Sequence, residues 1–278
     1  MPTGDQGGRD RQRISSAKFW LKSALAIVAV GSFLAWAWMP SHPDEPVYQG
    51  KTMSEWIKIY SQSDDGSEEE KKAEAAFQNI GTNVVPALLK MIQTPDSSFR
   101  TMLKALMRKQ SFIGPDFQDA EDIRNTALFG FRVIGEDTKG AVPELLSLVK
   151  RGSGTVGREE AIDALGYIGP SAQAAIPTLM AVVSDVKDQN RSHAVYSLGL
   201  ISSSAESVVP FLVSCLRDSD EGVRWRAANA LSQYDEAAKS SVPALVPLLA
   251  DPSEYVRKST TNALKRIDPA AAAAAGIK

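Results

Sequence analysis

An interval of 33 residues recurs through most of this 278-residue chain and constrains its fold more than any other feature. Proline, leucine, alanine, arginine and aspartate each return at this interval, and the five series keep one phase. The series are Pro177, Pro210 and Pro243, with Pro143 34 residues earlier; Leu165, Leu198, Leu231 and Leu264; Ala161, Ala194 and Ala227, with Thr260 next; Arg158, Arg191, Arg224 and Arg257; and Asp185, Asp218 and Asp251. Such self-similarity is the signature of proteins that stack one structural unit repeatedly.

Each unit is predicted to form two helices joined by a turn. The first helix carries a proline near its start, as in SVVPFLVSCL. Proline is tolerated there because the N–H groups of an opening helical turn have no helical partner. The second helix follows an aspartate-led turn, as in DSDEGVRWRAANAL, and has apolar residues at helical spacing. A single pair cannot bury its apolar face alone, so such pairs stack into a solenoid with a continuous core.

The order Pro-x-Leu-x-x-Leu, Asp, Val-Arg-x-x-Ala-x-x-Ala-Leu, Ile-Gly resembles the HEAT repeat in its short, HEAT-like form, a style shared with phycobilisome lyase subunits. The resemblance covers about residues 68–278 and implies an all-α fold, a right-handed α-solenoid of about five to six helical pairs. Ile168-Gly169 matches the end of the unit, whereas Asp235 follows a later unit without that glycine.

The resemblance also implies a role for two of the columns. In the family, the aspartate and arginine columns link successive turns of the solenoid. The resemblance therefore assigns a structural, non-catalytic role to Asp218 with Arg224 and to Asp251 with Arg257.

The part of the chain before the regular repeats departs from the period. Pro86 and Pro143 are 57 residues apart, which is one unit plus 23 residues, and we expect an irregular insertion at about residues 93–120. Its two interpretations are a degenerate helix with a long loop, and a partner-binding insertion. Residues 40–51 contain three prolines and predict a semi-rigid linker. Residues 52–61 predict a leading helix, with Thr52 and Glu55 at capping-box spacing.

An apolar segment near the N-terminus predicts a membrane anchor. Residues 1–17 form a polar, basic tail that we expect to be disordered, and residues 18–39 are predominantly apolar. The 21 residues from 19 to 39 span roughly 30 Å as a helix, the thickness of a hydrocarbon core. Tryptophan stands at both ends of the segment, as at membrane interfaces. The alternatives are a cleaved signal peptide, because Ala35-Trp36-Ala37 has the small-x-small form, and a buried core helix.

Charge divides the chain into the same two parts. Residues 1–40 carry five basic and two acidic residues, a net charge of +3, and the remainder carries −5. Basic residues before a membrane segment predict a cytoplasmic N-terminus, so a single-pass protein would hold its repeats on the extracytoplasmic, periplasmic side. An acidic body opposes the electrostatics of nucleic-acid binding, and we expect no nucleic-acid partner.

The sequence holds little material for catalysis. It contains no phosphate-binding loop, dinucleotide fingerprint, nucleophile elbow or HExxH motif. The one cysteine, Cys215, occupies an apolar position of its predicted helix, so we expect a small buried side chain there. Only two histidines are present. We therefore expect no cofactor, no metal and no small-molecule substrate. An enzyme or enzyme subunit of the HEAT-like lyase type is the alternative.

The second helices of HEAT solenoids line the concave face, which is their usual contact surface, so the resemblance directs attention to their non-core positions. The candidate contact residues are Tyr196, Trp225, Asn229, Asp163, Tyr167 and His193. Tyr196 and Trp225 lead because exposed aromatic side chains offer a large contact area at low entropic cost, although packing between repeats is an equal alternative. The sequence thus predicts a membrane-anchored, non-catalytic scaffold that binds a protein or peptide, with a purely architectural role as a further alternative.

Overall fold

The computed structural model describes residues 45–98 and 119–277. These residues belong to one of two compact units, made of residues 44–105 and 118–278. The tail predicted at 1–17, the anchor predicted at 18–39 and most of the insertion predicted at 93–120 lie outside the described residues. Within the described ranges, no helix is both long and apolar enough to span a membrane.

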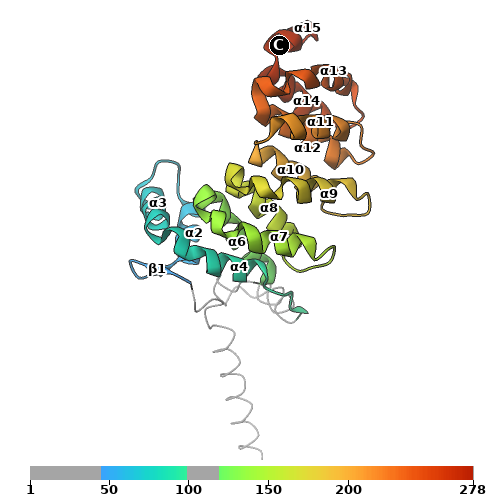
Figure 1. Ribbon diagram of the computed structural model, residues 1–278. Coiled ribbons are helices and arrows are strands. Elements are labelled where there is room, and N and C mark those ends of the chain that lie inside the picture. Colours follow the sequence, from blue (N-terminus) through green and yellow to red (C-terminus); the bar gives the residue numbers. More distant parts are fainter. Residues whose placement is uncertain (1–44, 99–118, 278) are drawn as a thin grey trace, which may run out of the picture. The chain divides into compact units, whose positions relative to one another are not determined.

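Six helical pairs follow one another through the described residues, coloured from blue to red in Figure 1. The pairs are α2 (Met53–Gln62) with α3 (Glu68–Ile80), α4 (Val85–Ile92) with α6 (Ala120–Ile134), α7 (Val142–Lys150) with α8 (Arg158–Ile168), α9 (Ile176–Ser184) with α10 (Arg191–Ile201), α11 (Ala205–Cys215) with α12 (Glu221–Leu231), and α13 (Val242–Leu245), continued by the 3-10 helix η5 (Val246–Ala250), with α14 (Glu254–Ile267). A short helix, α15 (Pro269–Ala274), packs on α14. The all-helical repeat stack predicted from the period is confirmed.

The core runs along the second helices of the pairs. Helix α8 packs against α10, α10 against α12, and α12 against α14. The alanine column lies at these contacts, and Ala161, Ala194 and Ala227 are all fully buried. Small side chains let the helix backbones approach closely, which explains why alanine recurs at this place in the unit.

Several second helices end at a residue with a positive φ. Short 3-10 helices connect one pair to the next: η1 (Gly81–Val84), η2 (Gly135–Ala141), η3 (Gly169–Ala175) and η4 (Ser232–Ser241). Gly135 and Gly169 have φ values of 59° and 73° where α6 and α8 end. Asp235 takes this conformation within η4, with φ 47°, and its carboxylate accepts a hydrogen bond from Arg266 at 2.6 Å. Glycine is favoured at such positions because it has no Cβ.

The chain before α2 differs from the linker predicted at 40–51. Strands β1 (Val47–Tyr48) and β2 (Lys51–Thr52) form an antiparallel hairpin around Gly50, whose φ is 76°. The hairpin is held to α2 because the indole of Trp56 donates a hydrogen bond to the backbone oxygen of Tyr48 at 3.0 Å. The capping box expected between Thr52 and Glu55 is confirmed at the start of α2.

Helix α2 was expected to lead into the solenoid as a separate element. It packs against α3 and forms the first pair of the stack. The aromatic side chain of Tyr60 explains this contact, because its ring meets that of Phe77 edge-on at 5.6 Å.

Candidate functional site on the second helices

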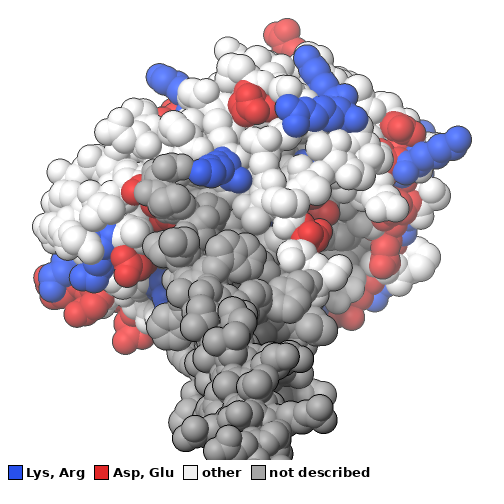
Figure 2. All heavy atoms as spheres, turned by 90° about the horizontal axis from the view of Figure 1, so that it is seen from below, with Lys and Arg blue, Asp and Glu red and all other residues white. Residues whose placement is uncertain are grey.

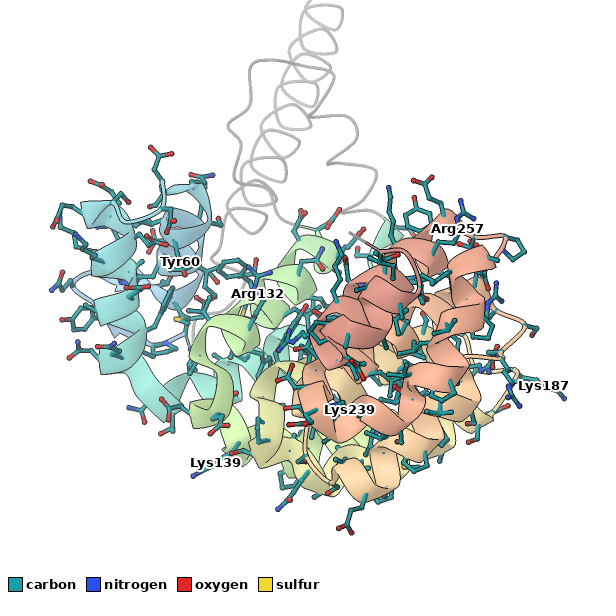
Figure 3. All side chains as sticks on the ribbon, turned by 90° about the horizontal axis from the view of Figure 1, so that it is seen from above. Tyr60, Arg132, Lys139, Lys187, Lys239 and Arg257 are labelled. Carbon is teal, nitrogen blue, oxygen red and sulfur yellow. The ribbon has the colours of Figure 1, made fainter. Side chains whose placement is uncertain are left out.

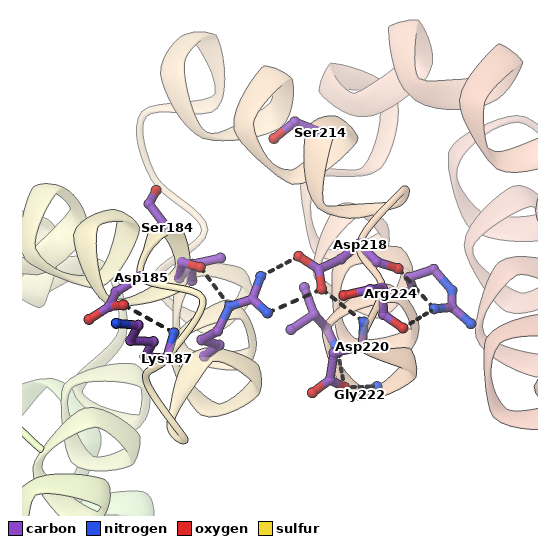
Figure 4. A network of polar contacts seen from close by, with 12 residues as sticks. Ser184, Asp185, Lys187, Ser214, Asp218, Asp220, Gly222 and Arg224 are labelled. Atoms are coloured by element: carbon purple, nitrogen blue, oxygen red, sulfur yellow. Dashed lines mark hydrogen bonds and ion pairs between the residues drawn. The ribbon is translucent and has the colours of Figure 1, made fainter.

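Arginine–aspartate pairs tie successive repeats to one another from α8 to α14. Arg191 directs its guanidinium group at the carboxylate of Asp218, and Arg224 contacts both carboxylate oxygens of Asp251 at 3.0 and 3.1 Å. Figure 4 shows these contacts around Asp218 and Arg224. Such two-point pairs fix geometry because both groups are planar.

The pairing corrects the one expected from the family resemblance. Asp218 and Arg224 meet only through the backbone, where Arg224 Nη1 donates to the carbonyl oxygen of Asp218 at 2.9 Å. Arg257 likewise donates to the backbone oxygen of Asp251 at 2.6 Å. Arg224 lies in the first turn of α12, so its Nη1 reaches back to the preceding turn while its Nε and Nη2 extend to Asp251 of the following repeat.

Two further columns at the 33-residue interval build the candidate functional site. Column A contains Asp163, Tyr196 and Asn229, and column B contains His193 and Arg226. Each column B side chain reaches the column A residue of the preceding repeat. His193 Nδ1 lies 3.0 Å from both oxygens of Asp163, and the guanidinium carbon of Arg226 lies 5.6 Å from the centre of the Tyr196 ring.

We call this surface the second-helix face. It comprises columns A and B with Tyr167 of α8, Trp225 of α12, and Phe129 and Arg132 of α6. All six contact residues predicted from the sequence belong to it, and every one of them is half-buried.

His193 joins α8 to α10 through two carboxylates. Its Nδ1 contacts Asp163, and its Nε2 lies 3.6 Å from an oxygen of Glu159. The hydrogen bond with Asp163 raises the pKa of His193 above its usual value, against a smaller opposing effect of burial. The raised pKa favours the protonated imidazole, which faces the carboxylates of Asp163 and Glu159.

Arg226 lies between two aromatic rings. Its guanidinium carbon is 5.0 Å from the Trp225 ring centre as well as 5.6 Å from that of Tyr196. Its Nη1 donates a long hydrogen bond of 3.4 Å to the backbone oxygen of Ser192, and its Nε is buried without an acceptor in the described part of the chain. The aromatic rings thus fix the position of a cation by stacking.

Tyr167 lies within electrostatic reach of the guanidinium groups of Arg132 and Arg226. Burial is the main cause that raises the pKa of its hydroxyl, with smaller raising effects from Tyr196 and Asp163. The positive charges of Arg132 and Arg226 act in the opposite direction. One phenol therefore experiences charges from α6, α8 and α12 together.

At the N-terminal end of the second-helix face, Arg132 and Phe129 form another pair of a cation with an aromatic ring. The guanidinium carbon of Arg132 lies 5.1 Å from the centre of the Phe129 ring, and Phe129 meets Tyr60 of α2 edge-on at 5.8 Å. Figure 3 labels Tyr60 and Arg132 on neighbouring elements of the unit. Arg132 is exposed, so its donors face solvent.

Arg226 and Arg132 were missed from the sequence. Arg226 stands 33 residues after His193, so the interval that defines the fold also marks it as the same position one repeat later. Arg132 follows Phe129 by three residues, which places both on one side of α6. Both signals were present in the pattern of non-core residues.

The described residues include the one cysteine of the sequence, Cys215. They contain no group of three or more His, Cys, Asp or Glu side chains placed to hold a metal ion. Cys215 is buried, and burial raises the pKa of its thiol to about 11, so the thiolate nucleophile is scarce near neutrality. Figure 2 shows basic and acidic side chains interspersed over a largely uncharged surface on the face seen from below.

Stacked helical pairs with a repeated arginine–carboxylate tie define an α-solenoid repeat protein. Residues 142–232 and 176–265 match the family model described as HEAT repeats, so this part of the chain consists of HEAT-like repeats. No curated protein is detectably similar in sequence.

Solved structures with similar folds include natural and designed repeat proteins. A complex of two phycocyanin lyase subunits from Nostoc sp. contains a chain 21% identical, with 85% of each chain covered and a TM-score of 0.45. An engineered protein is 19% identical over 78% of this chain and 96% of its own, with a TM-score of 0.42. A designed armadillo repeat protein is 15% identical over 78% of this chain and all of its own, with a TM-score of 0.40. These similarities carry no information on activity or partners.

Proposed function

We propose that the protein is a non-catalytic scaffold that binds a protein or peptide through the second-helix face. The observation that carries the proposal is the series of aromatic and charged side chains from α6 to α12, all half-buried except the exposed Arg132, which contact one another within and between repeats. Aromatic residues and arginine dominate the binding energy of protein interfaces. Repeats that stack through contacts with their neighbours form an extended surface, which suits a protein or peptide partner.

We also propose that residues 19–39 anchor this scaffold in a membrane, with the N-terminus cytoplasmic and the repeats on the extracytoplasmic side. The uncharged run from Ser23 to Met39 and the basic residues before it support this topology. Confinement near a membrane would raise the effective concentration of a partner there. Protease added outside the cytoplasmic membrane should degrade residues 50–278, and their complete protection until that membrane is lysed would contradict the topology.

The Trp225→Ala and Tyr196→Ala variants should each weaken partner binding at least about tenfold, because truncation of a central aromatic residue at an interface typically costs about 2 kcal/mol or more. The partner would first be obtained by photo-crosslinking from Asn229, on the same face, in the full-length protein in its membrane. Binding of the identified partner to each variant would then be measured by titration.

Tyr255→Ala is the matched control. Tyr255 is a 71% exposed aromatic residue of α14 outside the second-helix face, and its truncation should leave binding unchanged. Crosslinks from Ser184, an exposed residue of a first helix, should not yield the same partner. Unchanged binding by both Trp225→Ala and Tyr196→Ala would refute the assignment of the site.

A further inference from the structure

The second-helix face holds two guanidinium groups that have no carboxylate partner among the described residues. These groups belong to Arg132 of α6 and Arg226 of α12. Arg158, Arg191 and Arg224 of the inter-repeat ties, by contrast, each contact a carboxylate of the following repeat. Each of these two groups lies over an aromatic ring, at 5.0–5.6 Å from the ring centre, which restrains its position although no carboxylate balances its charge.

The acidic groups of the same face are already engaged. Asp163 contacts His193 Nδ1 at 3.0 Å, and Glu159 faces Nε2 of that imidazole at 3.6 Å. Arg132 and Arg226 therefore have hydrogen-bond donors without carboxylate acceptors, whereas His193 is matched by the carboxylates of Asp163 and Glu159. A partner that complements it must supply acceptors with negative charge.

We propose that the second-helix face recognises an acidic peptide segment, whose carboxylates bind Arg226 and Arg132 while its apolar parts contact Trp225 and Tyr196. This inference rests on the proposed function and names the chemistry of the partner. A guanidinium group binds a carboxylate through two parallel hydrogen bonds, and prior stacking reduces the entropy lost on binding.

The net charge of the chain makes this recognition local. Residues 41–278 carry a net charge of −5, so the overall field does not attract an acidic partner. Selectivity for carboxylates must come from short-range contacts at the two arginines. The Arg226→Lys variant should therefore bind an acidic peptide more weakly than the wild type does. Its ammonium group keeps the positive charge but lacks the planar pair of hydrogen-bond donors.

The test is selection of a random peptide library on the full-length protein, held in mild detergent. Peptides retained by the wild type but lost on Trp225→Ala are sequenced, and we expect Asp and Glu to exceed their library frequency at least about twofold. One synthetic peptide of the selected sequence is then titrated against arginine variants. Arg226→Gln and Arg132→Gln should each weaken its binding about tenfold, the size expected for a lost charge-assisted hydrogen bond.

Arg217→Gln is the matched control, since it removes the same charge from an exposed residue after α11 and should leave binding unchanged. Thermal unfolding followed by circular dichroism establishes that each variant is folded. Selected peptides that depend on Trp225 but carry no excess of acidic residues would overturn the acidic-peptide inference and leave the proposed face intact. No Trp225-dependent peptide from the library would overturn both.

Discussion

The Asp188→Asn exchange should lower the free energy of unfolding by about 3–5 kcal/mol, because it leaves the guanidinium group of Arg158 buried without a countercharge. The two side chains are only 5% and 6% exposed. Arg158 donates to both oxygens of Asp188, at 2.9 and 2.6 Å, and its Nε donates to the backbone oxygen of Val149 at 3.0 Å. Urea unfolding of the full-length protein, followed by circular dichroism, measures the change.

The same variant should show a characteristic dependence on pH. Burial alone would raise the pKa of the Asp188 carboxyl, but hydrogen bonds from Arg158 and from the backbone of Asn190 lower it overall. A lowered folded pKa stabilises the protein above the unfolded value, about 3.9, and this contribution is lost as the pH falls through the folded pKa. The difference between wild type and Asp188→Asn should therefore be full at neutral pH and shrink below about pH 4.

Glu236→Gln supplies the control for this experiment. It breaks an ion pair with Lys239 whose side chains are 85% and 53% exposed, and it should change stability by less than about 0.5 kcal/mol. A penalty for Asp188→Asn no larger than that of Glu236→Gln would show that the Arg158 pair contributes nothing beyond a surface ion pair.

Asp188 also shows where the repeat pattern stops predicting contacts. The aspartate column of the sequence runs through Asp185, Asp218 and Asp251, yet Arg158 pairs with Asp188. Helix α10 begins at Arg191, three residues later than the 33-residue register of α12 and α14 requires. The longer turn before α10 brings a different aspartate to the arginine, so loop geometry rather than residue spacing decides the partner.

The fold was predictable because stacking repeats the same local contacts at every unit. The buried leucine and alanine columns and the prolines in the first turns of α7 and α9 follow from one period, and the structure places them accordingly. Pro210 departs from the prediction, because α11 begins at Ala205 and the proline lies inside the helix. The site was less predictable because its contacts join different columns. Tyr196 and Trp225 were identified as aromatic residues outside the core, and the interval marks Arg226 as the position of His193 one repeat later. Its contacts with both rings, however, join different columns, and residue spacing alone does not predict them.

The Gly199→Ala exchange should destabilise the protein by up to about 2 kcal/mol, although alanine is the better helix former. Gly199 lies in α10, and a Cβ added there would stand 2.7 Å from both the Cα and the Cβ of Ala230 in α12. Helix propensity alone would stabilise the variant by about 1 kcal/mol, whereas overpacking of a close contact costs typically 1–3 kcal/mol. The Cα of Ala230 cannot move without its helix, so the packing cost determines the sign.

A second exchange separates backbone from side-chain crowding at this contact. Ala230→Gly removes the Cβ of Ala230 but leaves its Cα 2.7 Å from the added methyl group, so it should not restore the stability of Gly199→Ala. Gly140→Ala is the control, because a Cβ there meets nothing within 4 Å, and it should be neutral or slightly stabilising. Full rescue by Ala230→Gly, or a stability gain in Gly199→Ala itself, would mean that α10 and α12 separate at little cost. Because the second-helix face is built across this same contact, such easy separation would also remove the rigidity on which its binding of a partner depends.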